Sequence, residues 1–240
     1  MKGESYVELS IGGQMVPFQV KDTSGSKIGI RYHAADGQFQ IRIPGGKWTP
    51  DAERFVKQSE AWILEHLPSI MADKHRQEAW WQEVKNGHLQ IRGHRYELQV
   101  LVDRSTSFSI HENRIVLKGP AGADIRQLLE LGLLHYAKKV LPILVLKQAE
   151  ATGSRVKGIS IKRNLRSKWG SASSLGNINL NWLLIFLPEA QIQYLIIHEL
   201  MHFREMNHSD RFWAWVAQYE PNYKPLDRSL KDWGWLFGLF

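Results

Sequence analysis

The sequence predicts an α+β protein. Short runs of alternating apolar and polar residues recur in pairs around turn residues, which is typical of antiparallel hairpins. Longer amphipathic segments are interleaved with these pairs, and this order of elements is typical of the α+β class. No internal repeat stands out. We expect two regions, residues 1–86 and 87–240, which together could still form one continuous domain.

The first region is predicted to contain a hairpin and a helix. Residues 27–33 and 38–43 alternate on either side of the turn sequence Asp36-Gly37. Pro50 follows Thr49 and suits the first position of a helix, which we predict to run through Leu67. The stretch 72–82 either extends this helix or begins another.

The second region is predicted to begin with two more hairpins, followed by a long helix and two strands. Gly93-His94 and Glu112-Asn113 are the expected hairpin turns, and Gly153 ends the helix. The turn between the last two strands contains Trp169-Gly170-Ser171. The expected elements are strands at 89–92, 96–102, 108–111 and 114–117, a helix at 124–151, and strands at 156–162 and 177–180.

A histidine pair near the C-terminus predicts a metal site. His198 and His202 lie four residues apart in a segment that begins at Pro188, where a helix is expected, so both side chains lie on one helix face. Glu199 is rotated by about 100° from His198, which places its carboxylate beside a shared cation rather than on it. This arrangement suits a metal with an adjacent general base.

A third ligand is expected from His208, because catalytic zinc usually takes three protein ligands. A helix that continued through His208 would point this side chain away from the site, so the chain must turn first. Asn207 tolerates a left-handed backbone and is the expected turn residue. Ser209 then caps a new helix that contains Phe212 and Trp213.

Composition restricts the class of protein and its partners. The 240 residues include no cysteine, which excludes disulfides and thiolate metal sites. The first residues lack the apolar core of a signal peptide, and the longest apolar stretch is broken by Lys138-Lys139 and Pro142, so we expect a cytoplasmic protein with no membrane span. The net charge of +7 suits a nucleic-acid, nucleotide or other anionic partner. A local basic cluster comprises Lys157, Lys162, Arg163, Arg166 and Lys168.

The segment from Lys168 to Trp213 resembles the YgjP-like metallopeptidase-domain family, whose members are related to the SprT-like zinc proteins. The residues behind this resemblance are SKWGSASSLGNINLN and LPEAQIQYLIIHELMHFREMNHSDRFW. Lys168 stands where the family usually has arginine, and Ala172 where it usually has cysteine. The resemblance implies a zincin-like metallopeptidase fold, with His198, His202 and His208 as zinc ligands and Glu199 as the catalytic residue.

A zinc-dependent hydrolase acting on a protein or peptide is the preferred interpretation. A peptide can add as an extended strand to a sheet edge beside the metal, and residues 177–181 are the expected edge. We therefore predict a role in substrate binding for Lys168, Trp169, Gly170, Asn177 and Asn179. The donor to the reacting oxyanion is not determined by the sequence; the candidates are Tyr194, Tyr219, Tyr223, Lys168 and Arg163.

Two alternatives keep the metal site but change its use. The family has also been associated with nucleotide pyrophosphatase activity, and the basic cluster would suit a triphosphate, although no glycine-rich phosphate cradle accompanies it. The other alternative is a non-catalytic zinc module that binds DNA or protein. An intact Glu199 argues against this alternative, because a structural site needs no base.

Overall fold

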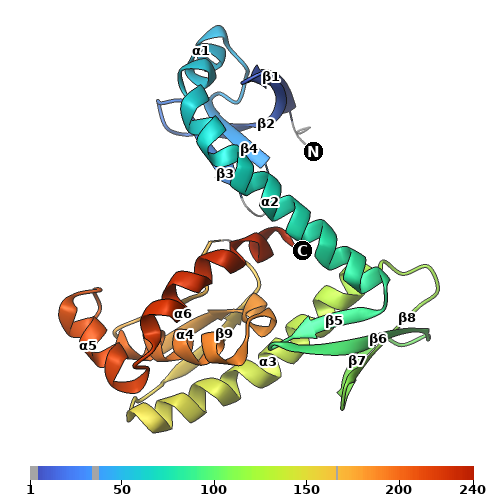
Figure 1. Cartoon of the computed structure of the whole chain (residues 1–240), viewed down its shortest axis with the longest axis vertical. Coiled ribbons are helices and arrows are strands. Elements are labelled where there is room, and N and C mark those ends of the chain that lie inside the picture. Colours follow the sequence, from blue (N-terminus) through green and yellow to red (C-terminus); the bar gives the residue numbers. More distant parts are fainter. Residues whose placement is uncertain (1–4, 34–37, 166) are drawn as a thin grey trace. The chain divides into compact units, whose positions relative to one another are not determined.

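The computed structural model describes residues 5–33, 38–165 and 167–240, and it combines helices with three sheets (Figure 1). The chain divides into two compact units, one formed by Met1–Ala79 with Phe237–Leu239, and the other by Trp80–Leu236 with Phe240. The division falls inside a helix, α2 (Glu60–Lys85), whereas the boundary predicted at 86/87 coincides with the end of this helix. The predicted mixture of helices and sheets is confirmed.

The first unit contains a four-stranded sheet of order β1-β2-β4-β3. Its strands are β1 (Ser5–Ile11), β2 (Gln14–Thr23), β3 (Gly29–His33) and β4 (Gln38–Pro44). The predicted antiparallel pairing of β3 with β4 is confirmed, although the turn at Asp36-Gly37 lies outside the described residues. The hairpin of β1 and β2 was not predicted; its signal is the alternation of residues 5–11 before Gly12-Gly13, both of which have positive φ.

Two helices follow this sheet. α1 (Pro50–Gln58) begins where predicted, and the Thr49 hydroxyl accepts a hydrogen bond from the Ala52 N–H. The prediction of one helix through Leu67 is wrong, because α1 ends at Gln58 with Ser59 as its C-cap, and α2 starts at Glu60. α2 continues through residues 72–82. Apolar residues from the sheet and both helices form one core, which includes Phe18, Phe39, Ile41, Val56 and Ile63.

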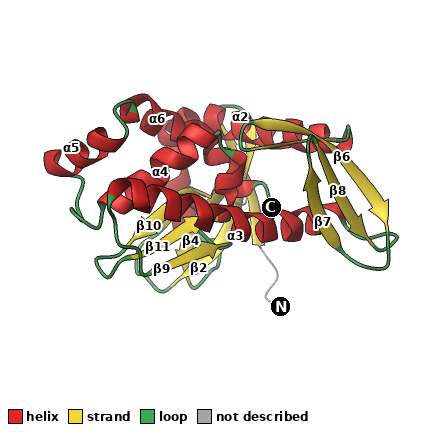
Figure 2. Cartoon of the chain, turned by 90° about the horizontal axis from the view of Figure 1, so that it is seen from below, coloured by secondary structure: helices red, strands yellow, loops and turns green. Residues whose placement is uncertain are grey.

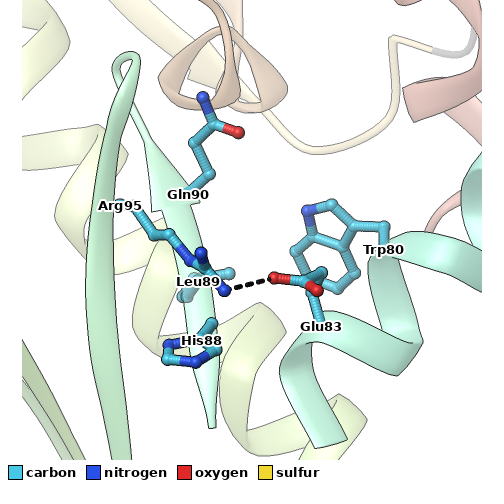
Figure 3. A pocket seen from close by; sticks show the side chains of 6 residues that line it. All are labelled: Trp80, Glu83, His88, Leu89, Gln90 and Arg95. Carbon is cyan, nitrogen blue, oxygen red and sulfur yellow. Dashed lines mark hydrogen bonds and ion pairs between the residues drawn. The ribbon is translucent and has the colours of Figure 1, made fainter. Parts of the chain in front are cut away.

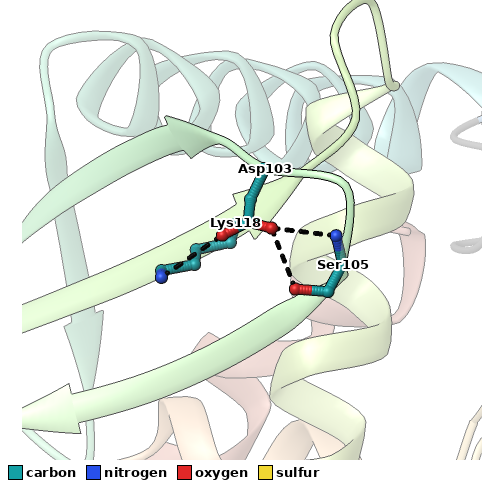
Figure 4. A network of polar contacts seen from close by, with 3 residues as sticks. All are labelled: Asp103, Ser105 and Lys118. Atoms are coloured by element: carbon teal, nitrogen blue, oxygen red, sulfur yellow. Dashed lines mark hydrogen bonds and ion pairs between the residues drawn. The ribbon is translucent and has the colours of Figure 1, made fainter.

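The second unit begins with a sheet of order β5-β6-β8-β7. Its strands are β5 (His88–Ile91), β6 (His94–Val102), β7 (Ser107–His111) and β8 (Arg114–Gly119), and both predicted hairpins are confirmed. After β6 the Asp103 carboxylate accepts hydrogen bonds from the backbone N–H and hydroxyl of Ser105 and pairs with Lys118 at 3.4 Å (Figure 4). These contacts close the connection between β6 and β7.

The two four-stranded sheets share one topology, which corrects the expectation that the chain contains no repeat. Each sheet starts with a tight antiparallel hairpin, places its second strand parallel to its fourth, and pairs its third strand with its fourth. The turns also match, since φ is 55° and 80° at Gly12-Gly13 and 53° and 80° at Arg92-Gly93. The two sheets share few identical residues at equivalent positions, and these are scattered along the strands. The sequence pattern therefore does not reveal the repeat.

The rest of the second unit combines a long helix with a small sheet. α3 (Ile125–Thr152) stops before Gly153, as predicted, and Gly153 has the left-handed conformation; Asp124 caps the start of the helix. The sheet has the order β10-β11-β9, with β9 (Gly158–Lys162), β10 (Gly170–Ala172) and β11 (Asn177–Asn181). Two expectations are wrong here: residues 170–172 form a strand rather than a turn, and residues 177–181 form the central strand rather than an edge.

The C-terminal part is helical. A 3-10 segment, η1 (Trp182–Phe186), leads into α4 (Glu189–Met201), followed by α5 (Asp210–Tyr219), α6 (Tyr223–Ser229) and η2 (Leu230–Gly238). α4 contacts α3, α5, α6 and β10, and Figure 2 shows α4 beside α3 and α6. Within the described ranges, none of the helices has the length and apolar character needed to cross a membrane.

Candidate metal centre

α4 presents two of the predicted ligands, His198 and His202, at its C-terminal end. Most of this helix is buried, and its own apolar side chains point inward on several sides, among them Ile192, Leu195, Ile196 and Leu200. His202 occupies the C-cap position, and its Nδ1 lies 3.1 Å from the Glu205 carbonyl oxygen. The predicted geometry of the histidine pair therefore holds, although the helix ends within the motif.

A turn after α4 brings in the third predicted ligand, His208. The helix stops at Met201 and α5 starts at Asp210, with the Ser209 hydroxyl accepting a hydrogen bond from the Phe212 N–H as predicted. The expected left-handed conformation of Asn207 is wrong, because positive φ among the described non-glycine residues occurs at Arg92 and Glu112. Instead, the Asn207 side-chain oxygen accepts a hydrogen bond from the Ser209 N–H at 3.2 Å. The side chain, not a strained backbone, stabilises this turn.

The three histidines converge on one point. One nitrogen from each of His198, His202 and His208 lies within 4.8 Å of the other two, and Nε2 of His198 and of His208 are 3.1 Å apart. Across a tetrahedral zinc ion with bonds of about 2.0–2.1 Å, two donor nitrogens are about 3.3 Å apart. The spacing and the nitrogen donors therefore fit a metal ion.

The electrostatic environment keeps two of the three histidines neutral. Burial, together with the nearby His202 and His208, lowers the pKa of His198 to about 3. Burial also lowers the pKa of His202 from its ordinary value. A neutral imidazole has a lone pair for a metal ion, so these side chains are ready to bind a cation at neutral pH.

Glu199 lies beside the histidines with a carboxylate that is nearly inaccessible to solvent. Its side chain is 5% exposed, and within the described part of the chain its Oε2 is buried without a hydrogen-bond partner. Burial raises its pKa to about 7, and the Lys168 cation opposes this rise. A buried carboxylate oxygen without a partner is costly unless another group uses it, as a base uses its lone pair during catalysis.

The edge strand β10 passes directly alongside Glu199. A Cβ atom built on Gly170 would lie 2.6 Å from Oε1 of Glu199, so only glycine allows the strand to approach this closely. Backbone hydrogen bonds join Trp169 to Asn181 and Ser173 to Asn177. Because antiparallel strands alternate inward and outward groups, Gly170 and Ala172 direct their N–H and C=O groups away from β11. These groups face the open side of the sheet.

The predicted substrate-binding residues separate into two groups. Lys168, Trp169 and Gly170 lie at the start of β10, and the effect of Lys168 on the pKa of Glu199 places its charge within electrostatic range of that carboxylate. The asparagine side chains of β11 lie on the opposite sheet face from the Gly170 Cβ direction, and Asn179 donates a hydrogen bond to the Ser171 hydroxyl at 3.2 Å. The structure does not bring Asn177 and Asn179 together with the histidines.

Three of the five candidate oxyanion donors have other partners. Tyr194 donates to Asp227, and the Tyr219 hydroxyl lies 3.2 Å from the Thr152 carbonyl oxygen. Arg163 donates to Glu130 at 2.7 Å. Lys168 and Tyr223 remain, and the Tyr223 ring stacks on Trp213 with 5.1 Å between centroids. Arg166 of the basic cluster lies outside the described residues.

Sequence reasoning missed a buried asparagine that holds the loop before β10. Asn181 is fully buried; its Nδ2 donates to the carbonyl oxygens of Leu165 at 2.6 Å and Lys168 at 3.1 Å, and its Oδ1 accepts from the Leu183 N–H. One side chain thus joins β11, η1 and the loop that carries Lys168. An asparagine directly before the apolar run of residues 182–187 is the signal that could have identified it.

A cavity of about 240 Å³ lies elsewhere in the second unit, between the end of α2 and strands β5 and β6. Figure 3 shows Glu83 and Arg95 pointing toward each other, joined by an ion pair of 2.9 Å. None of the histidines, Glu199 or the β10 residues lines this cavity. It is therefore separate from the candidate metal centre.

A family profile and two solved structures are similar to parts of this chain. The sequence profile of the YgjP-like, metallopeptidase domain matches residues 27–232. A metallopeptidase zymogen of Pyrococcus abyssi, abylysin, is 25% identical over 39% of this chain and 94% of that chain, with a TM-score of 0.35. A second zymogen, jannalysin of Methanocaldococcus jannaschii, is 19% identical over 39% of this chain and 96% of that chain, with a TM-score of 0.33. No curated protein sequence matches significantly. The profile spans most of the chain, which therefore belongs to the YgjP-like metallopeptidase-domain family.

Proposed function

We propose that this protein is a zinc-dependent peptidase with a zincin-like catalytic region. The observation that supports this most strongly is the convergence of three histidine nitrogens next to Glu199, whose buried Oε2 has no partner within the described ranges. Zinc is proposed because imidazole nitrogens suit it and because three protein ligands leave a position open. A bound zinc ion would polarise the scissile carbonyl and increase the acidity of water.

Glu199 is proposed as the general base. With a pKa raised to about 7 by burial, its carboxylate is suited to accept a proton from the attacking water near neutral pH and to pass it to the leaving amine. The contact with Gly170 fixes Oε1 against the backbone of β10. Oε2 of Glu199 then remains available to accept the proton of the attacking water.

The substrate is proposed to be an extended peptide that pairs with the open edge of β10. The outward N–H and C=O groups of Gly170 and Ala172 can bond to a strand on this side, and Gly170 is also the residue nearest Glu199. This corrects the sequence-based choice of residues 177–181 as the edge, because β9 and β10 flank β11. Lys168, just before this edge, is proposed to stabilise the oxyanion.

The structure gives less support to nucleotide hydrolysis. The charge of Arg163, one of the cations expected to bind a triphosphate, is already paired with Glu130. Binding of nucleic acid or nucleotide through the basic surface remains a prediction.

The proposal is tested by measuring hydrolysis with purified protein, with and without zinc. An unfolded casein-like protein, the same protein with added DNA, and nucleoside triphosphates are supplied separately, and each is also tested with Glu199→Gln. We expect zinc-dependent peptide cleavage that the variant lacks. Triphosphate hydrolysis without peptide cleavage would favour the pyrophosphatase, and stoichiometric zinc with no turnover of any substrate would favour a binding module.

A further inference from the structure

The two ring nitrogens of His198 face different partners. Nε2 lies 3.1 Å from Nε2 of His208, in the middle of the metal centre, whereas Nδ1 lies 3.4 Å from the Tyr194 hydroxyl. A neutral imidazole carries one proton. If Nε2 gives its lone pair to the metal, the proton is on Nδ1 and needs an acceptor, so the group at Nδ1 determines whether Nε2 is available.

The Tyr194 oxygen can accept a hydrogen bond from Nδ1–H of His198, because the tyrosine's own O–H already donates to another group. The hydroxyl donates to Oδ1 of Asp227 at 2.7 Å, which leaves the lone pairs of the tyrosine oxygen for the N–H of His198. The tyrosine is fully buried, so water does not compete for these bonds. Tyr194 lies one turn before His198 on α4, and Asp227 comes from a separate helix, α6.

The other ligands are held differently. Nδ1 of His202 faces the Glu205 carbonyl oxygen, a backbone group three residues away. The ring of His208 stacks on Trp213, with 5.7 Å between centroids. Among the hydrogen bonds of the described residues, His198 is thus the one of the three whose ring nitrogen connects through Tyr194 to a carboxylate on another helix.

We infer that Asp227 is a positioning residue for the metal centre, acting on the ligand His198 through the hydroxyl of Tyr194. The Asp227 carboxylate accepts a hydrogen bond from the Tyr194 hydroxyl, and the tyrosine oxygen accepts one from Nδ1–H of His198. The lone pair on Nε2 of His198 is then available to the metal. The inference rests on the proposed function, because it requires that the three histidines bind a metal. It makes the docking of α6 a determinant of metal affinity.

The test uses Asp227→Asn, which keeps the shape but removes the charge, and Tyr194→Phe, which removes the hydroxyl. The matched control is Ser229→Ala, because Gln191 of α4 donates to the Ser229 hydroxyl at 2.6 Å and this bond joins the same two helices without reaching a ligand. Zinc affinity is measured by competition with a chromogenic chelator. The absorption spectrum of the cobalt-substituted protein reports ligand geometry independently of activity.

We expect Asp227→Asn and Tyr194→Phe each to weaken zinc binding by about 10- to 100-fold and to alter the cobalt spectrum, while Ser229→Ala changes neither. In the Tyr194→Phe background, Asp227→Asn should add little, because the connection is already broken. Thermal unfolding of the metal-free variants checks that each still folds.

Three results would overturn the inference while leaving the metal site intact. They are unchanged affinity in Asp227→Asn, an equal loss in Ser229→Ala, and an undiminished effect of Asp227→Asn when Tyr194 is already phenylalanine. A parent protein that binds no zinc would instead contradict the proposed function itself. Measuring zinc binding by the parent protein therefore distinguishes a failure of this inference from a failure of the proposed function.

Discussion

Replacing Glu199 by glutamine tests both the chemistry and the electrostatics of the site. The change keeps the shape of the side chain and removes its charge, so zinc should stay bound while turnover falls by about 10²–10⁴-fold or more. Metal content and turnover are measured on the same preparation. Loss of zinc would mean that Glu199 is a ligand, and unchanged turnover would exclude it as the base.

The same substitution should stabilise the zinc-free protein at high pH. Burial raises the pKa of Glu199 from 4.5 to about 7, and at about 1.4 kcal/mol per pKa unit its ionisation in the folded state costs about 3 kcal/mol. The folded state therefore binds the Glu199 proton more tightly than the unfolded state does. This contribution to the free energy of unfolding is fully present below pH 4.5 and is lost as the pH rises through 7. The Glu199→Gln variant does not lose this stability at high pH, because glutamine does not ionise.

Amide hydrogen exchange of α4 measures the difference, since the chain divides into two units and a whole-chain signal would combine their transitions. With zinc removed by a chelator, we expect the opening free energy of Glu199→Gln to exceed that of the parent by up to about 3 kcal/mol at pH 8 and to equal it at pH 4. A difference that does not change between these pH values would refute the argument that the buried charge is the cause.

Three further predictions concern the neighbours of Glu199. His208→Ala should lose the metal while retaining the fold, and stoichiometric zinc in this variant would place the third ligand elsewhere. Gly170→Ala should lower kcat by about 10-fold or more with zinc retained, because the new Cβ would displace Oε1 of Glu199. The control is Ser171→Ala, because the Ser171 side chain lies on the other face of the sheet. Equal effects of the two substitutions on kcat would contradict the contact between Gly170 and Glu199. Lys168→Gln should raise the pKa of Glu199 and shift the acidic limb of the kcat/KM profile to higher pH, because the Lys168 cation lowers this pKa; a limb that stays in place would remove Lys168 from the site.

The three histidines of the candidate metal centre could be predicted to come together from the sequence because their geometry is local. Two residues four apart on a helix must share a face, and a third after a helix stop can return to it. The cap at Ser209 could be predicted for the same reason. The role of Asn207 could not, since an asparagine stabilises turns either through a left-handed backbone or through its side chain, and sequence does not distinguish the two.

The surroundings of Glu199 depended on contacts that sequence patterns do not reveal. β10 consists of Gly170, Ser171 and Ala172, which are small residues without the alternation that indicates a strand. Consequently the sequence pattern favours residues 177–181 as the edge, because their alternation is clear. Asp227 lies 33 residues from Tyr194, and only the packing of α6 on α4 brings the two together.

If a substrate pairs with β10 as proposed, an edge this short would recognise the conformation of the substrate more than its sequence. Gly170 and Ala172 offer backbone groups only, and these can bond to any residue except where a proline lacks its N–H. To reach them, a segment must be extended and must have its own backbone bonds unmade, which a stable helix or sheet does not allow. Under the proposed function, the protein would therefore discriminate between ordered and disordered chains, and damaged or incompletely folded proteins would be cleaved before intact ones.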